Sequence, residues 1–158
     1  MKKIILASGS AQRKKLLKMA GLKFTIKKSR ADEIQRIKTT CAALVKENAL
    51  LKARDAAARL KTGIVIGADT VVYGGGKTLI GKPKDLADAR RILRVMAAKP
   101  HWVYTGVAVI DAQTRRTVVD YEKTKVYMHL LTRREMDRYH AHITPLDKAG
   151  GFDIEGRG

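Results

Sequence analysis

The ten residues from Ile64 to Tyr73, IVIGADTVVY, constrain the fold more than any other stretch of this chain. The valines and isoleucines of this run are β-branched residues on both faces of an extended segment, a pattern typical of a buried strand. The same run carries Asp69, and an ionised carboxylate is expensive to bury unless it is paired, hydrogen-bonded or bound to a cation. Taken alone, Asp69 fits two interpretations: a structural residue near a strand end, or a working carboxylate.

Hydrophobic patterning around this run predicts a single mixed α/β domain over residues 1–158. Strands are expected at residues 4–7, 22–26, 64–72, 79–80, 102–111 and 117–129, and helices at residues 11–20, 40–60, 85–98 and 132–140. Thr132 and Glu135 have the spacing of a helix capping box. The inward faces of the first and third helices are expected to consist of Leu16, Leu17 and Ala20, and of Leu86, Ala89, Leu93 and Met96.

The composition limits the function classes. No apolar run approaches the roughly 20 residues of a membrane span, and Ile4–Ala7 is too short for a signal-peptide core. The single Cys41 excludes an internal disulfide, and we expect a cytoplasmic protein. The net charge of +18 fits a polyanionic small molecule or a nucleic acid. Nucleic acid is the less favoured partner, because the few aromatic residues are not interleaved with the basic ones along the chain.

The segment Ser8–Arg13 has the layout of an anion site: a strand, a turn of small residues and the start of a helix. Unsatisfied N–H groups at a helix start favour phosphate. Ser8 and Ser10 could add hydroxyl donors and Arg13 a guanidinium fork. A capped helix with solvated basic side chains fits the same residues, and the P-loop pattern is absent.

Further charged residues could complete a site for a triphosphate. Lys82 lies in a turn between Gly81 and Pro83, and Lys52 lies at the flank of the apolar face of the second helix. Each lysine alone is also consistent with an ordinary surface position. Asp69 and Glu33 could hold Mg²⁺ against the phosphates, because carboxylate oxygens are hard ligands.

Short blocks of characteristic sequence occur along essentially the whole chain: LASGSAQRKKLL at 6–17, DE at 32–33, KA at 52–53, GADTVV at 67–72, GKP at 81–83, YTGV at 104–107, EKTKV at 122–126 and DKAGGF at 147–152. In their residues and their order, these blocks resemble the Maf family of nucleoside triphosphate pyrophosphatases. The resemblance implies an elongated, two-lobed fold like that of inosine triphosphate pyrophosphatases, with a mixed sheet, flanking helices and a central cleft. It also implies a homodimer.

The resemblance further implies hydrolysis of a nucleoside triphosphate to the monophosphate and pyrophosphate with a divalent metal, Mg²⁺ or Mn²⁺. By the same correspondence, Asp69 is the general base, although a metal-binding role is equally compatible with the sequence. The phosphate-binding residues would be Ser8, Ser10, Arg13, Lys52 and Lys82. Glu33 would assist as a metal ligand or in the base function.

Three positions are expected to set the choice of substrate. The dTTP/UTP branch has Arg, Thr and Gln at these positions, and the 7-methyl-GTP branch has an aromatic residue, Gln and Glu. This chain has Gln12, Thr70 and Glu155. Thr70 favours the pyrimidine branch, whereas Glu155 favours the other, since a carboxylate prefers amino or ring N–H groups on a base. The sequence therefore leaves the preferred nucleotide open, and modified nucleotides are among the candidates.

The sequence departs from the family pattern at two further points. One arginine of the opening motif is replaced by Gln12, and the sequence stops at Gly158, before a further strand and helix. The expected domain thus lacks the family's C-terminal segment, and lost core elements would weaken it. These departures and the high charge support an alternative: a catalytically weakened Maf-fold protein that binds nucleic acid or another polyanion.

Overall fold

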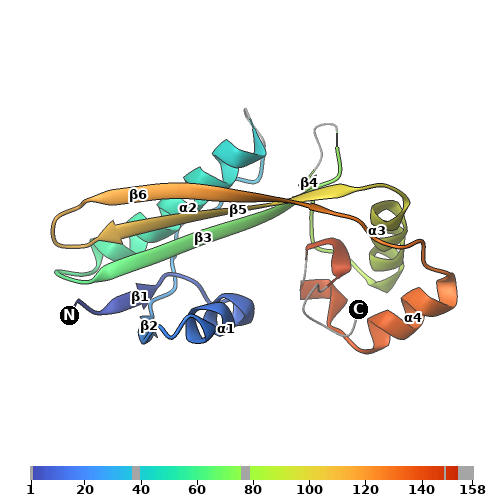
Figure 1. Cartoon of the computed structure of the whole chain (residues 1–158), viewed down its shortest axis with the longest axis horizontal. Helices are drawn as coiled ribbons and strands as arrows, with labels where there is room; N and C mark the ends of the chain where they lie inside the picture. The colour runs from blue at the N-terminus through green and yellow to red at the C-terminus, as the bar shows by residue number, and fades with distance from the viewer. Residues whose placement is uncertain (1, 37–39, 76–78, 148, 153–158) are drawn as a thin grey trace. The chain divides into compact units, whose positions relative to one another are not determined.

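The computed structural model describes residues 2–36, 40–75, 79–147 and 149–152, and it confirms the expected mixed α/β fold (Figure 1). None of the helices in these ranges has the length and hydrophobicity that a membrane span needs. The elements follow in the order β1 (Ile4–Leu6), α1 (Ala11–Met19), β2 (Phe24–Ile26), α2 (Cys41–Ala58), β3 (Ile64–Tyr73), β4 (Leu79–Ile80), α3 (Leu86–Ala98), β5 (His101–Asp111), β6 (Thr117–Val126) and α4 (Arg133–Ala141), with short 3₁₀ turns at Pro145–Asp147 and Ala149–Gly151.

The chain divides into two compact units. The first unit consists of residues 1–70 and 105–122, and the second of residues 71–104 and 123–158. Strands β3, β5 and β6 contribute residues to both units. The sheet has the order β2-β1-β3-β5-β6, and β4 pairs with β3 outside this path.

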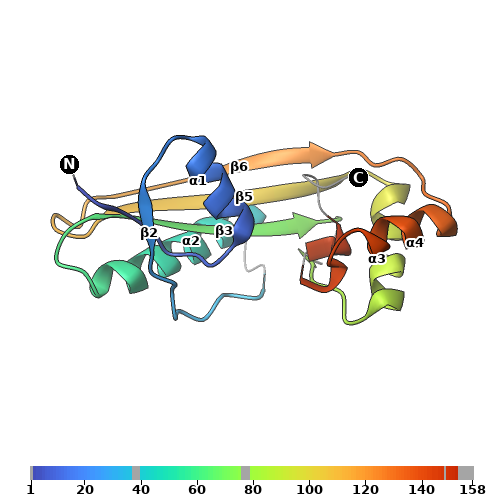
Figure 2. The ribbon, with the colours of Figure 1, turned by 90° about the horizontal axis from the view of Figure 1, so that it is seen from below.

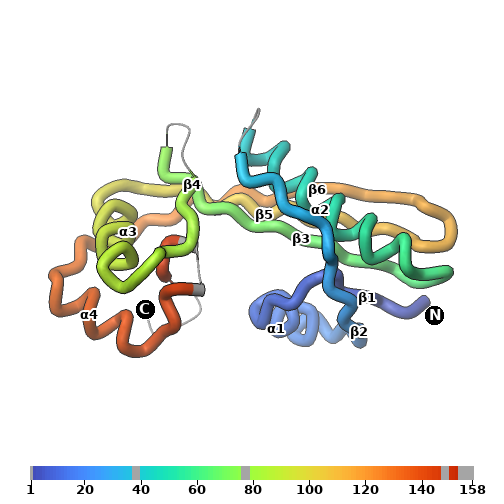
Figure 3. Tube along the Cα trace, turned by 180° about the vertical axis from the view of Figure 1, so that it is seen from behind, coloured from blue at the N-terminus to red at the C-terminus, as the bar shows by residue number. Residues whose placement is uncertain are grey.

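The core of the first unit lies between α2 and the sheet. Strand β1 pairs in parallel with both β2 and β3, so that Ile5 lies opposite Thr25 and Val65. Figure 3 shows α2 lying along β3 and β5. The shared core consists of small and β-branched side chains: Ile5, Ala7, Ala49, Ala53, Ala56, Ala57, Val65, Ala108, Ile110 and Ala112. The alanines let the helix approach the strands closely, and apolar burial stabilises this contact.

Two strand glycines make this approach possible. A Cβ on Gly67 would lie 2.3 Å from the carbonyl oxygen of Ala49 and 2.7 Å from the amide nitrogen of Ala53. A Cβ on Gly106 would lie 2.3 Å from the carbonyl oxygen of Val45. The backbone of α2 therefore rests directly on β3 and β5 at these two positions.

Helix α1 lies beside β1 and β2 (Figure 2) but does not bury the face that its sequence predicts. The expected inward residues Leu16 and Ala20 are exposed, Leu17 is half-buried, and no residue of α1 is fully buried. The apolar-stripe prediction was wrong, because this short helix is held through its polar first turn, where Ser10 caps the helix and Arg13 contacts β3.

The second unit is organised around α3. Its buried side chains include Ala89, Leu93 and Met96, as expected, but Leu86 is about half exposed because it is the first residue of the helix. Arg90 of α3 forms an ion pair with Asp137 of α4. The capping box between Thr132 and Glu135 is confirmed. Strand β6 ends at Val126, three residues before the expected His129.

Lysines and aromatic rings stack at the second-unit ends of β5 and β6. The ammonium of Lys123 lies 4.0 Å from the centre of the Trp102 ring, and that of Lys125 lies 5.0 Å from the centre of the Tyr127 ring. Such cation–π contacts are attractive. Lys123, Lys125 and Tyr127 alternate along the chain and Trp102 joins them from β5, so basic and aromatic side chains interleave at this place, unlike the sequence expectation.

Acidification is expected to destabilise the second unit before any carboxylate titrates. His101 and His140 are buried, and burial lowers the pKa of both rings. An unfolded histidine titrates near pH 6.5, so below about that pH the unfolded chain binds protons that the folded chain does not. The free energy of unfolding therefore has its full value above about pH 7 and decreases as the pH falls through 6.5. The measurement is the urea midpoint, followed by Trp102 fluorescence at about pH 7.5 and about pH 5.5; equal midpoints would contradict the expectation.

Candidate active site

The buried carboxylate of Asp69 is bonded through both of its oxygens. Asp69 lies within β3 and is 5% exposed. The ammonium Nζ of Lys52 lies 2.7 Å from Oδ1, and the amide Nδ2 of Asn48 donates to Oδ2 at 3.0 Å. These contacts offset the desolvation of the carboxylate and fix its orientation.

The two partners of Asp69 come from one face of α2. Asn48 and Lys52 are four residues apart, so their side chains project from the same side of the helix. That side packs on β3, where the missing side chain of Gly67 lets the helix backbone approach. The helix–strand contact therefore determines whether the amide and the ammonium reach Asp69.

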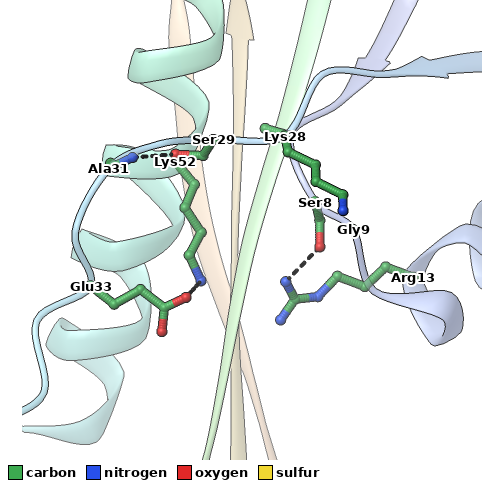
Figure 4. Close-up of a pocket in the computed structure, with 9 residues that line it drawn as sticks. Ser8, Gly9, Arg13, Lys28, Ser29, Ala31, Glu33 and Lys52 are labelled. Carbon is green, nitrogen blue, oxygen red and sulfur yellow. Dashed lines mark hydrogen bonds and ion pairs between the residues drawn. The ribbon is translucent and has the colours of Figure 1, made fainter. Parts of the chain in front are cut away.

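Asn48 also fixes the segment that carries Glu33. The backbone N–H of Ile34 donates to Oδ1 of Asn48 at 2.8 Å, and Nδ2 of Asn48 donates to the carbonyl of Ile34 at 3.1 Å. Next to this pair, Oε1 of Glu33 lies 2.8 Å from Nζ of Lys52 (Figure 4). Two carboxylates, one buried and one about half exposed, thus converge on a single ammonium.

The turn between β1 and α1 is tied to the same strand by Arg13. Its Nη1 donates to Oγ of Ser8 at 3.1 Å and to the carbonyl of Ala68 at 2.8 Å, and its Nη2 donates to Oγ1 of Thr70 at 3.3 Å. Burial lowers the pKa of Arg13, and the negative charges of Asp69 and Glu33 oppose that shift. Because a guanidinium is not deprotonated in proteins, Arg13 carries its positive charge into the site.

Ser8, Arg13, Glu33 and Lys52 line a pocket of about 180 Å³ within the first unit, and Asp69 adjoins it through its ion pair with Lys52. Figure 4 shows Ser8, Gly9, Arg13 and Lys28 on one side, and Glu33 and Lys52 on the other. Small-molecule pockets span roughly 300–1,000 Å³, so this one suits a charged phosphate group better than a whole nucleotide.

The structure brings together most of the site residues that the sequence predicts. The first unit contains Ser8, Arg13, Glu33, Lys52, Asp69 and Thr70, joined by the contacts above. Ser10 accepts a hydrogen bond from the amide of Arg13 as the N-cap of α1, and Gln12 is half-buried in that helix. Lys82 is exposed and belongs to the second unit. Glu155 lies outside the described residues.

Sequence reasoning missed two residues of the pocket region. Asn48 is not among the residues predicted for the site, although a polar residue within the apolar face of the second helix is itself a signal. Lys28 lies in the polar segment after β2, and nothing in the sequence distinguishes it from neighbouring lysines.

Comparison with known proteins finds relatives that match over nearly the whole chain. The family model described as Maf-like protein matches residues 3–158. A dTTP/UTP pyrophosphatase of Alkaliphilus metalliredigens is 44% identical over 99% of this chain and 81% of its own length. A dTTP/UTP pyrophosphatase of Bacillus cytotoxicus is 43% identical over the whole chain and 81% of its own length. The solved Ham1 protein of Staphylococcus aureus shares the fold, with a TM-score of 0.52 at 17% identity over 78% of this chain and 70% of that one.

Proposed function

The chain belongs to the family of Maf-like proteins, and from this we propose that it is a nucleoside triphosphate pyrophosphatase. It would hydrolyse a nucleoside triphosphate to the monophosphate and pyrophosphate. The observation that carries the proposal is the convergence of Asp69 and Glu33 on Lys52, beside a pocket that also contains Arg13. The curated relatives support dTTP or UTP as substrate, and a modified nucleotide such as 7-methyl-GTP is the competing choice.

In the proposed reaction, water attacks the α-phosphorus and the bond from this phosphorus to the bridging oxygen of the β-phosphate breaks. Asp69 accepts the proton of the attacking water, and pyrophosphate leaves with the bonding electrons. Lys52 and Asn48 hold the carboxylate of Asp69 in place. Arg13 and Ser8, with Ser10 at the helix start, bind phosphate oxygens, and Lys82 is proposed as a further phosphate-binding residue.

Glu33 and Asp69 fit a divalent metal, Mg²⁺ or Mn²⁺, that is shared with the substrate. Within the described ranges, no three His, Cys, Asp or Glu side chains cluster as a metal site. Two carboxylates that converge on one point are instead typical of Mg²⁺ sites completed by substrate phosphates and water. When bound, the metal would neutralise the phosphate charge that builds up on the leaving group.

The remaining expectations are part of the same proposal. Residues 1–158 would act as a single catalytic domain, in the cytoplasm and as a homodimer, and Gln12, Thr70 and Glu155 would set the choice of base. A polyanion-binding protein that has lost catalysis is not favoured, because Asp69 and Lys52 retain their mutual contact.

Pyrophosphate release from a panel of nucleotides tests the proposed function. We expect turnover of dTTP or UTP with Mg²⁺ or Mn²⁺, at a kcat/KM at least about tenfold above that of CTP and 7-methyl-GTP, the size of a single differential contact of about 1.4 kcal/mol. Chelation of the metal is expected to abolish release. Turnover of none of the four nucleotides would reject the proposal, whereas preference for 7-methyl-GTP would reject only the pyrimidine assignment.

A further inference from the structure

Lys28 extends over a position that has no side chain. It follows β2, and Figure 4 shows its side chain reaching toward Ser8 beside Gly9. A Cβ on Gly9 would lie 2.7 Å from Cε and 3.2 Å from Nζ of Lys28. The end of this lysine is therefore seated against the backbone of the turn between β1 and α1, within the lining of the pocket.

The ammonium of Lys28 lies in this pocket without a carboxylate partner among the described residues. Lys52 contacts both Asp69 and Glu33, and Arg13 donates to neutral oxygens of the protein. With any residue that the structure describes, Nζ of Lys28 forms no hydrogen bond or ion pair. Three cations and two carboxylates leave one positive charge, and without Lys28 the group would be neutral.

We propose that Lys28 binds the pyrophosphate portion of the substrate and, after cleavage, the pyrophosphate product. This inference rests on the proposed function for the identity of the substrate. The reacting α-phosphorus must lie against Asp69, next to Lys52, whereas Lys28 lies on the Ser8 and Arg13 side of the pocket. The outer phosphates would therefore point toward Lys28. An ammonium, with three donors and a flexible stem, can follow a phosphate chain as its charge shifts during cleavage.

Binding of inorganic pyrophosphate to the whole chain, measured by titration calorimetry with Mg²⁺, tests the proposal. Lys28→Met keeps the unbranched stem but removes the ammonium, and it is expected to weaken pyrophosphate binding about tenfold or more, the effect of one charged hydrogen bond. Lys23→Met is the matched control, because Lys23 is an exposed lysine of the same region that does not line the pocket. The affinity of Lys23→Met for pyrophosphate is expected to stay within about twofold of that of the unsubstituted chain. Unchanged affinity in Lys28→Met, or an equal loss in both variants, would overturn the proposal.

Gly9→Ala tests the seating of Lys28 independently. The new methyl group meets only the end of a flexible side chain, and Gly9 has no positive φ, so the fold should tolerate it. We expect Gly9→Ala to weaken pyrophosphate binding when it is introduced into the unsubstituted chain. In the Lys28→Met background it should cause no further loss, which is the signature of coupled residues. Equal losses in both backgrounds would contradict the seating. If nucleotide turnover fails while pyrophosphate binding still depends on Lys28, the proposed function falls and the anion site stands.

Discussion

Asp69→Asn is expected to lower kcat about 10³-fold with its best nucleotide while the protein stays folded. A positioned general base contributes roughly 10²–10⁴-fold, and the amide has nearly the same shape but does not accept the proton. Lys52 keeps its contact with Glu33 in this variant, so no buried charge is left without a partner. Pyrophosphate release and a thermal unfolding curve measure the two effects.

A metal titration separates the two possible roles of Asp69. If Asp69 is the base, raising the Mg²⁺ or Mn²⁺ concentration should not restore the rate of Asp69→Asn, whereas a metal ligand would show partial recovery at high metal. Asp120→Asn, a change at an exposed carboxylate of β6, is the control and should keep full activity. Full activity in Asp69→Asn would exclude a working role for this carboxylate.

Gly106→Ala is expected to destabilise the chain by about 3 kcal/mol, at the upper end of the usual overpacking range. The added Cβ would lie 2.3 Å from the carbonyl oxygen, and 2.4 Å from the carbonyl carbon, of Val45. These are backbone atoms of α2, so relief requires moving the helix. The measurement is the free energy of unfolding from urea denaturation.

Gly81→Ala provides the matched control for the loss of a glycine. Nothing lies within 4 Å of a Cβ at Gly81, and its φ is not positive. The variant should be unchanged or more stable by up to about 1 kcal/mol, because alanine restricts the unfolded chain. Equal stability of Gly106→Ala and Gly81→Ala would show that α2 does not rest on β5 as described.

The elements were predictable because their signals are local. The run around Asp69 and the capping box at Thr132 each specify a strand or a helix end within a few residues. The family resemblance also points to Asp69, Glu33 and Lys52 as residues of one site, but it predicts phosphate and metal contacts for them and not the ion pairs of Lys52 with both carboxylates.

What the sequence did not predict depends on contacts between distant segments. Asn48 bonds to residues 14 and 21 positions away, and these bonds exist only once α2 has settled on β3. Lys28 becomes distinct from its neighbours only because Gly9 leaves room for it. The exposure of Leu16 reverses a periodicity argument, since α1 is fixed by Arg13 rather than by an apolar face.

The contact of α2 with Gly67 limits the substitutions that this chain can accept without altering its site. The alanines that support the helix alternate along it with Asn48 and Lys52, so core and site share one surface. A larger residue at Ala49 or Ala53 would lift the amide and the ammonium away from Asp69 even if the fold survived. Substitutions of core residues in α2 are therefore expected to change the site as well. Helices α3 and α4 are better places for substitutions intended to diversify or stabilise the protein.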